Sequence, residues 1–412
     1  MTQNFKDLLY LFACGALGNK ADINHNIDIM EIYKLSVKQG IWHTVFLALN
    51  DIKESELLNW GELSFEQLNF DTLQTAMLNQ RKLVNVHNFI KKLEDGGVNA
   101  TVLKGESLSK LYKNPLCRIS SDTDLLIDEK LEKKAVAIAE EFGMEVATRN
   151  ASSNHALARS ASTGLVELHI HLYDEMLEDI WFDNKMANQE ETITIKTEDN
   201  FTINTLGITD GAIFTALHMI KHFLEKGVGV RQMMDTLIYL KNYKNQIDFK
   251  RFNDMMKYLK YDKFMDNIIG IGIEYFKFDK EELPKVGYSV TLMEQILNDS
   301  ENGGVFGYGA ESGSDFYEVY SRERFNRFKN GDYDEYMNKL KNANRLKMLF
   351  PNRTLLKNKY PYVTKHKWLV PVAWIHRILN KIFKKKQKVT FDNVKNDAIK
   401  QRMEMINNLE MI

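Results

Sequence analysis

Residues 118–127 read RISSDTDLLI, and in this segment two aspartates separated by one residue lead into an apolar run. Side chains alternate between the two faces of a β-strand, so Asp122 and Asp124 are predicted to point the same way. Two carboxylates a few ångströms apart repel each other unless a cation lies between them. A divalent metal ion, which prefers oxygen ligands, would remove that conflict. The segment therefore predicts a strand that carries a metal-binding pair of acids.

A second strand-like run is predicted to supply a third acid. In residues 165–172, LVELHIHL, the apolar residues share one face, and Glu167 shares the other with two histidines. If this strand neighbours the first, Glu167 completes a three-carboxylate cluster of the kind that suits two Mg²⁺ ions about 3.5–4 Å apart in phosphoryl or nucleotidyl transfer. We expect His169 to support the acids rather than act as a base, and His155 to be an ordinary polar residue of the sheet or surface.

A strand–turn–helix unit precedes the acids. Residues 98–103 form a short β-like run, and Gly105 stands where this strand enters a short helix. Glycine there lets a phosphate approach the backbone and the first N–H groups of the helix, and Lys104 would add a positive charge. The alternative is an ordinary turn with a surface lysine, since Glu106 would compete with an anion. The other D-x-D, at 332–334, lacks this context and is interpreted as a solvated helix start.

The rest of the chain is predicted to be helical around one α+β unit. Residues 1–95 carry helical spacing of apolar side chains, residues 96–206 form the α+β unit, and helices return in 207–298. Residues 299–314 hold five glycines and are predicted to be a loop or hinge that opens a C-terminal helical region, 299–412. We therefore expect an α+β fold, with a mixed β-sheet core flanked by N-terminal and C-terminal helical regions.

The composition is that of a globular protein. Of 412 residues, 44% are hydrophobic, 27% are charged and only 5 are prolines, which favours long helices. Lys and Arg number 55 against 56 Asp and Glu, so the net charge of −1 argues against a globally basic nucleic-acid binder. The two cysteines, Cys14 and Cys117, form no C-x-x-C pair, so we expect no disulfide framework and a reducing cytoplasm.

Residues 368–388 are the segment that most suggests contact with a membrane. No run reaches the roughly 20 uncharged apolar residues that span a bilayer. In this segment, however, apolar side chains recur at helical spacing up to Phe383, and four lysines follow within five residues. A basic amphipathic helix of this kind could lie on an anionic membrane surface. A terminal helix docked on the protein, with a solvated basic end, is the simpler interpretation.

The ordered combination of these motifs resembles a largely uncharacterised bacterial nucleotidyltransferase family of the DNA-polymerase-beta-like superfamily. The combination is L-K-G, a short helix, R-x-x-x-D-x-D-L-L-I, and V-E-L-H about 40 residues on. Residues 218–222, HMIKH, and 230–235, VRQMMD, are similar to the family's helical segment after the sheet. Together with the helical regions on either side, the similar segments are spread over most of the length of the chain. The resemblance implies that the mixed sheet is a nucleotidyltransferase-type core.

The resemblance also implies roles for the acids and the phosphate-binding residues. Asp122, Asp124 and Glu167 would be the catalytic acids and the ligands of Mg²⁺ or Mn²⁺, with Glu167 helping to activate an acceptor hydroxyl. The triphosphate of an NTP would be held by Lys104, Gly105 and Ser107, and Arg118 would neutralise charge on a phosphate or on the acids. The wider superfamily has a Gly-Ser pair after the first strand, whereas this chain has Lys104-Gly105-Glu106, with Ser107 two residues late.

Two cations on the helices after the sheet are further predicted nucleotide contacts. Lys221 would reach a phosphate from the helix face above the cleft. Arg231 would contact the nucleotide, although an ion pair with Asp235, four residues on, is the alternative. His218 and His222 have the i, i+4 spacing of a helical metal pair. No Glu follows His218 as in H-E-x-x-H, so we expect a polar helix face rather than a zinc site.

The predicted reaction is transfer of an NMP from an NTP to a hydroxyl acceptor, with release of pyrophosphate. The acceptor could be a small molecule, a saccharide, a peptide or a protein. The near-neutral charge disfavours nucleic acid, with tRNA as the remaining case. Two alternatives stay open. One is a sugar-nucleotide-dependent glycosyltransferase with a D-x-D metal site, which would need a larger α/β half before the motif. The other is a catalytically degenerate nucleotide-binding module.

Overall fold

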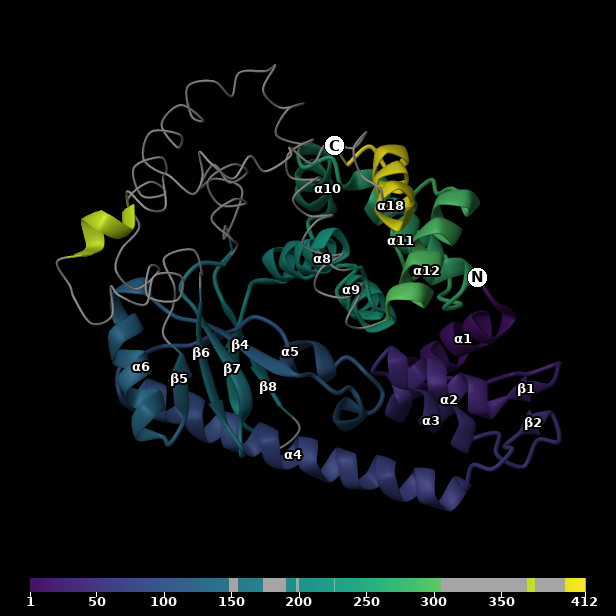
Figure 1. The fold of residues 1–412 in the computed structure, drawn as a ribbon, viewed down its shortest axis with the longest axis horizontal. Helices are drawn as coiled ribbons and strands as arrows, with labels where there is room; N and C mark the ends of the chain where they lie inside the picture. The colour runs from purple at the N-terminus through teal and green to yellow at the C-terminus, as the bar shows by residue number, and fades with distance from the viewer. Residues whose placement is uncertain are drawn as a thin grey trace. The chain divides into compact units, whose positions relative to one another are not determined.

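The structure is a computed structural model that describes residues 1–147, 155–172, 190–197, 200–225, 227–304, 369–374 and 397–411. The chain divides into two compact units. The first is residues 1–314 with 404–411, and it contains the sheet and the helices around it; the second is residues 315–403 with Ile412 (Figure 1). The D-x-D at 332–334 lies outside the described residues. So does the amphipathic segment 368–388, apart from residues 369–374, which are helical.

Four helices and two very short strands precede the sheet. The helices are α1 (Gln3–Leu17), α2 (Ile29–Lys38), α3 (Trp42–Asn50) and α4 (Phe65–Asp95). The predicted helical character of residues 1–95 is confirmed except at β1 (Ile27–Asp28) and β2 (Leu58–Asn59), which pair in parallel. α1 and α3 pack closely. Gly15 of α1 lies so near α3 that a Cβ atom at this position would meet the carbonyl oxygen of Thr44.

The long helix α4 connects this helical region to the sheet (Figure 1). The hydroxyl of Ser64 caps its first turn, and Gly96 follows its last residue. The C-terminal half of α4 buries Val86, Phe89 and Leu93 in the core beneath the sheet. This single helix of 31 residues thus packs against the sheet with its C-terminal half and leads into it from the N-terminal helices.

The core of the unit is a seven-stranded mixed sheet with the order β5-β6-β7-β4-β3-β9-β8. The strands are β3 (Thr101–Val102), β4 (Asp122–Leu126), β5 (Glu145–Ala147), β6 (His155–Ser160), β7 (Gly164–His169), β8 (Ile193–Lys196) and β9 (Thr202–Thr205). β4 pairs with β7 and β3 with β9 in parallel, whereas the other pairs are antiparallel. The predicted α+β class is confirmed, and β8 and β9 form an antiparallel pair at one edge of the sheet.

One face of the sheet forms the hydrophobic core, and this leaves the other face for polar residues. Val166 and Leu168 of β7 are fully buried and pack with Leu125 of β4 and with the helices α4 and α6 (Glu132–Glu141). Because side chains alternate along a strand, the residues between them project from the opposite face. Short 3-10 turns flank β4 and are η1 (Pro115–Cys117) and η2 (Glu129–Leu131).

Helices return after β9, as predicted. They are α8 (Ile208–Glu225), α9 (Val230–Asn242), α10 (Phe249–Tyr258), α11 (Asp262–Glu274), α12 (Val290–Gly303) and, near the C-terminus, α18 (Asp397–Asn408). α8 contacts α9, and both stand above the sheet in Figure 1. Among the described residues, no helix combines the length and the apolar character that a membrane span needs.

The predicted loop at 299–314 is wrong for its first residues, because 299–303 form the last turn of α12. Side chains from the N-terminal helices satisfy the carbonyl groups that a helix leaves free at its end. Gln39 donates to the carbonyl of Ser300 at 2.7 Å, and Lys38 donates to the carbonyls of the next two residues at 2.7 and 2.9 Å. This capping by distant residues allows the helix to continue as far as Gly303. Residues 305–314 lie outside the described residues.

Candidate active site

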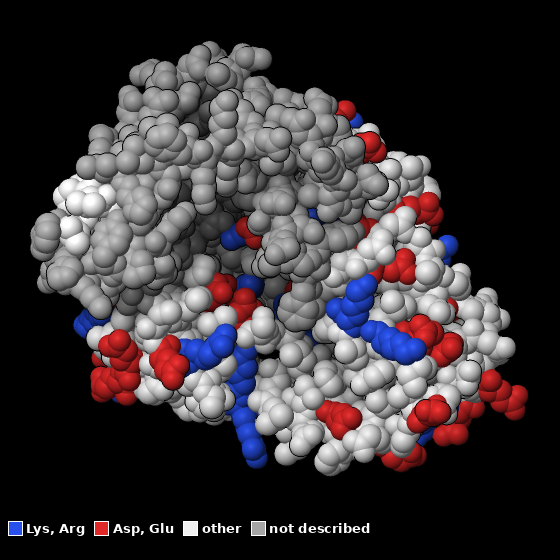
Figure 2. Space-filling view, in the orientation of Figure 1, with Lys and Arg blue, Asp and Glu red and all other residues white. Residues whose placement is uncertain are grey.

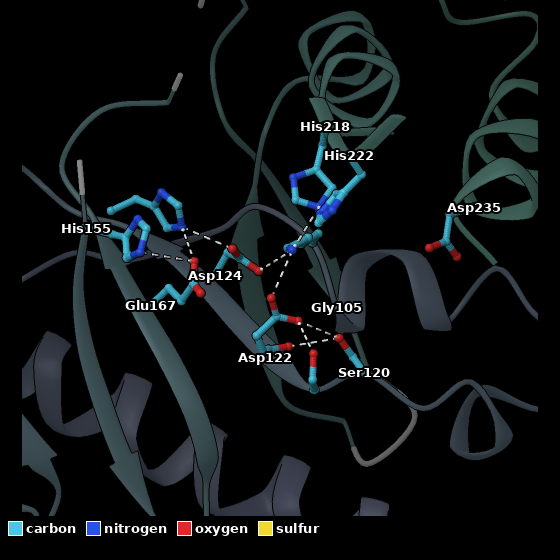
Figure 3. Close-up of polar contacts among 12 residues, drawn as sticks. Gly105, Ser120, Asp122, Asp124, His155, Glu167, His218, His222 and Asp235 are labelled. Carbon is cyan, nitrogen blue, oxygen red and sulfur yellow. Dashed lines mark hydrogen bonds and ion pairs between the residues drawn. The ribbon is translucent and has the colours of Figure 1, made fainter. Parts of the chain in front are cut away.

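Three carboxylates meet on the face of the sheet opposite the hydrophobic core. In the parallel pairing of β4 with β7, Asp124 lies directly opposite Glu167, and Asp122 precedes Asp124 on the same face. One oxygen from each of the three side chains lies within 4.8 Å of the others (Figure 3). The structure therefore brings together the three acids that the sequence analysis selected.

Lys104 lies among these acids. Its Nζ is 3.1 Å from Oδ2 of Asp122, 3.3 Å from Oδ2 of Asp124 and 3.0 Å from Nε2 of His218. Burial alone would lower the pKa of Lys104, but the two aspartates outweigh burial and raise it. Burial alone would raise the pKa of Asp122, yet the ammonium of Lys104 holds it well below its usual range. Lys104 thus supplies the positive charge that two close carboxylates require.

Two histidines stand at the other end of the acid row. Nε2 of His169 is 3.0 Å from Oδ1 of Asp124 and 3.2 Å from Oε2 of Glu167. Burial tends to lower the pKa of His169, but its hydrogen bonds to these two carboxylates raise it overall. Nε2 of His155 lies 3.8 Å from the same Oε2, and the two imidazole rings are 4.9 Å apart. His169 therefore supports the acids, as predicted.

Sequence reasoning missed the place of His155. β6 and β7 form a hairpin, in which His155 lies directly opposite His169. Both imidazoles therefore project from the same face as the acids. The tight turn at residues 161–163 was a usable signal, because counting outward from it pairs position 155 with position 169.

The backbone before the acids makes a sharp turn at Gly105. Its φ of 85° and ψ of −102° lie in a region that side-chain-bearing residues rarely adopt. The helix that follows, α5 (Glu106–Ser109), has only four residues. The carboxylate of Glu106 turns to Nε2 of His87 at 2.6 Å, and the ring of His87 stacks on Phe201. Glu106 is thus engaged by a side chain of α4.

Arg118 forms a buried ion pair with Asp235 of α9. Its Nε and Nη2 donate to the two carboxylate oxygens at 2.6 and 2.7 Å, and its Nη1 donates to the carbonyl of Gly105 at 3.2 Å. The hydroxyl of Tyr112 donates to the same carboxylate at 2.7 Å. Burial opposes the charge of Arg118, but Asp235 outweighs it and raises the guanidinium pKa. Asp235 therefore pairs with Arg118, and the Nη1 of Arg231 donates to the carbonyl of Ile119.

A cavity of about 240 Å³ lies between Asp122, at one end of the acid row, and the helices α8 and α9. Lys104 and Asp122 line it from the sheet, His218 and His222 from α8, and Arg231 from α9. Figure 3 shows both histidines projecting from the helix toward the acid row. The cavity approaches the lower end of small-ligand pockets, about 300 Å³.

The other predicted nucleotide-binding residues are placed differently. Arg118 also lines the cavity, although its guanidinium is paired with Asp235. Gly105, Ser107 and Lys221, all within the described part of the chain, are not among the residues that line it. Ser107 is buried. Lys221 is half-buried on α8, near enough to His218 for its charge to help lower the pKa of that histidine.

The acids have the chemistry of a divalent-metal site. Oδ2 of Asp124 is buried and accepts no hydrogen bond from any of the residues that the structure describes. The ammonium of Lys104, 3.3 Å from this oxygen, is the cation that now compensates its charge, and a divalent ion could take that place. Carboxylate oxygens from Asp122, Asp124 and Glu167 are the ligands that Mg²⁺ and Mn²⁺ prefer. These three residues could therefore hold such an ion.

The charge on the described part of the face in Figure 2 is mixed. On the face drawn in Figure 2, basic and acidic side chains are interspersed over the described surface. This mixture agrees with the net charge of −1. A large single-sign field of the kind that gathers nucleic acid is not visible on the described part of that face.

A comparison with known families agrees with this arrangement of sheet and acids. A family model described as "Uncharacterised nucleotidyltransferase" matches residues 25–276. The match covers more than half of the chain and includes the seven strands, the three acids and the helices α8 and α9. The chain belongs to this nucleotidyltransferase family, as the sequence resemblance indicated. Neither a curated protein nor a solved structure matched the chain.

Proposed function

We propose that the protein is a metal-dependent enzyme of the DNA-polymerase-beta-like superfamily that moves an NMP from an NTP to a hydroxyl acceptor. The observation that supports this proposal is the cluster of Asp122, Asp124 and Glu167: one oxygen from each lies within 4.8 Å of the others, and Asp122 lines a cavity. Mg²⁺ or Mn²⁺ held by these acids would stabilise the negative charge that develops on the phosphates.

The chemistry assigned to the chain's own residues is proton transfer and positioning. The acceptor oxygen forms a bond to the α-phosphorus, the bond from that phosphorus to the β-phosphate oxygen breaks, and pyrophosphate leaves. Glu167 takes the proton of the acceptor hydroxyl as the bond forms. Asp122 and Asp124 are held on one strand, so their separation is fixed before substrate arrives.

In the proposed reaction, Lys104 contacts the carboxylates first and the phosphates of the NTP once a metal ion is bound. A divalent cation beside Asp122 and Asp124 repels the ammonium that now contacts both carboxylates. Since Lys104 also lines the cavity, its ammonium can turn there and meet the phosphates of the NTP. Arg231 is the second basic residue proposed for the phosphates. Contacts from Gly105, Ser107, Arg118 and Lys221 stay predictions of the family resemblance.

The proposed acceptor is a small molecule, a saccharide, a peptide or a protein. The described part of the face in Figure 2 has mixed charge and no broad basic track for a long nucleic acid. Of the nucleic acids, tRNA is included in the test below. Cys14 and Cys117 are free thiols, which supports a reducing compartment. The proposed location is a bacterial cytoplasm, which the family resemblance favours.

Thermal unfolding with nucleotides tests the proposal. Wild type, Asp122→Asn and Asp124→Asn are each scanned with ATP, GTP, CTP and UTP, in Mg²⁺, in Mn²⁺ and in EDTA. A nucleotide at about 100 times its Kd stabilises the wild type by roughly 2.7 kcal/mol. The stabilisation should require metal and should disappear in both variants. The matched control is Asp254→Asn, which alters an exposed i, i+4 ion pair on α10 and should keep the full response.

The pattern of responses separates the proposal from its alternatives. A variant at Asp122 or Asp124 that binds metal–NTP like wild type would sink the proposed site. A shift with sugar nucleotides but with no NTP would favour a glycosyltransferase. With the preferred NTP known, pyrophosphate release is measured over acceptor panels that include tRNA. Binding without release across these panels would favour the degenerate module.

A further inference from the structure

The far end of the acid row carries a mixed set of nitrogen and oxygen ligands. We infer that His155, His169 and Glu167 form a binding site for a transition-metal ion of the Zn²⁺ kind, next to the Mg²⁺ position proposed at Asp122, Asp124 and Glu167. Its ligand atoms would be Nε2 of both histidines and Oε2 of the glutamate. The site shares Glu167 with the proposed catalytic acids, but it needs neither a nucleotide nor an acceptor to form.

The strand pairing holds these three side chains on one face. His155 of β6 lies directly opposite His169 of β7, and Glu167 is two residues before His169 on the same strand. Alternation along β7 places both side chains on the face opposite the core. The three ligands thus come from a two-stranded hairpin within the sheet, where the backbone cannot easily move them apart. Figure 3 shows His155 and Glu167 together on one side of Asp124.

The distances suit one ion between the three atoms. Oε2 of Glu167 lies 3.2 Å from Nε2 of His169 and 3.8 Å from Nε2 of His155. Ligands about 2.1 Å from a tetrahedral ion lie about 3.4 Å from each other, so both separations fall close to this value. One possible ligand atom from each of the three residues lies within 4.8 Å of the others. An ion can therefore bind with only small side-chain rotations.

The contacts that the two histidines make with the carboxylates differ in length. Nε2 of His169 is within hydrogen-bond distance of Oδ1 of Asp124, at 3.0 Å. The 3.8 Å approach of His155 to Glu167 is too long for a hydrogen bond. It is, however, an ordinary separation for two ligands of one metal ion. The convergence of two imidazoles on one carboxylate oxygen therefore favours a metal site.

The ligand types select the class of ion. Imidazole nitrogens suit Zn²⁺, Co²⁺ and related transition metals, whereas Mg²⁺ takes oxygen ligands. Two histidines and one glutamate also leave a position open on a tetrahedral ion, as in sites that keep a water molecule. The cavity beside Asp122 is lined by none of these three residues. The proposed ion therefore lies at the end of the acid row away from that cavity.

Co²⁺ binding to the full chain tests the inference, because Co²⁺ replaces Zn²⁺ and absorbs visible light. Metal-depleted wild type, His155→Gln and His169→Gln are titrated with Co²⁺, and bound Co²⁺ is then displaced with Zn²⁺. We expect one Co²⁺ per chain in the wild type and a Kd at least about tenfold higher in each variant. The control His25→Gln removes an exposed histidine that pairs with Asp7, and it should bind Co²⁺ like wild type.

The outcomes separate this inference from the proposed nucleotidyl transfer. Asp122→Asn should lose the metal-dependent response to NTP but keep Co²⁺ affinity within about twofold. Equal Co²⁺ affinity in wild type and His155→Gln, or Co²⁺ binding that depends on Asp122 and not on His155, would overturn the inference. If His155→Gln does not fold, pulsed EPR of Cu²⁺-loaded wild type decides. Coupling to two imidazole nitrogens is expected, and no nitrogen coupling would refute the site.

Discussion

Asp124 of β4 and Glu167 of β7 are direct partners in a parallel pair of strands, and Nε2 of His169 lies within 3.2 Å of both carboxylates. Parallel strands inside a sheet are fixed by hydrogen bonds along their length. The separation of the two acids is therefore a property of the backbone. A site of this kind keeps its geometry when its ligands change, and the variants below test individual side chains against that fixed frame.

Replacing Lys104 should reveal its competition with a metal ion. Lys104→Met leaves the carboxylates of Asp122 and Asp124 without their cation, so the free energy of unfolding should fall by about 3 kcal/mol. Mg²⁺ should then stabilise the variant more than the wild type, because no ammonium must leave. Thermal unfolding with and without Mg²⁺ measures both effects. An equal response to Mg²⁺ in the two proteins would contradict the proposed exchange. Lys91→Met, at an exposed ion pair, should change stability by less than about 1 kcal/mol.

His218 should make the protein less stable in mild acid. Burial of the ring and the ammonium of Lys104 hold the pKa of His218 well below its usual value. Below about pH 6.5 the unfolded chain binds a proton at this histidine and the folded chain does not, so stability falls as the pH falls. Between pH 7.5 and 5.5, wild type should lose about 1 kcal/mol more than His218→Gln in urea unfolding. A difference between the two proteins that stays constant with pH would argue against this assignment.

The buried pair of Arg118 and Asp235 should be costly to break from one side. Asp235→Asn leaves the guanidinium buried beside a neutral amide and should cost about 3–5 kcal/mol in urea unfolding. The double variant Arg118→Met, Asp235→Leu should lose clearly less free energy of unfolding than the sum of the losses in Arg118→Met and in Asp235→Leu. Strict additivity would show that the two side chains do not act as a pair. The half-exposed pair of Lys241 and Glu282 offers a comparison, expected at about 1 kcal/mol or less.

Gly105 should resist substitution because of its backbone conformation. The nearest heavy atom to an added Cβ is 3.8 Å away, so space is available, but φ is 85°. Gly105→Ala should therefore cost about 1–3 kcal/mol through strain alone, or shift the turn that leads to Lys104. Thermal unfolding measures the first effect, and the nucleotide response measures the second. Gly287→Ala, where nothing lies within 4 Å of the added atom, should be close to neutral. If both substitutions are neutral, the turn does not constrain the site.

Alternation of side chains was enough to predict the acids. The pattern in residues 122–127 placed Asp122 and Asp124 on one face, and the pattern in 165–172 placed Glu167 on the polar face of another strand. Both patterns are local, so the sequence displays them directly. The parallel register that sets Asp124 against Glu167 depends on chain segments far apart, and no local pattern determines it.

Contacts between distant residues explain what sequence reasoning did not predict. The spacing of Arg231 and Asp235 suggested a pair on one helix, which is worth about 0.2–0.5 kcal/mol. Arg118, 117 positions away, instead forms a buried bidentate ion pair with Asp235. Likewise, the glycines after residue 299 suggested a loop, because capping of α12 by Lys38 and Gln39 is visible only in the folded chain. His155 is the exception, since a local hairpin indicated its position.

The two walls of the cavity are joined before any ligand arrives. Arg118 ties the segment before β4 to α9 through Asp235, and Lys104 meets His218 of α8 beside the acids. Separating these walls would expose a buried charge, so the described part of the cleft is poorly suited to opening as a hinge. A ligand that enters it has little conformational disorder to remove, and its affinity should reflect direct contacts rather than the cost of reshaping the protein.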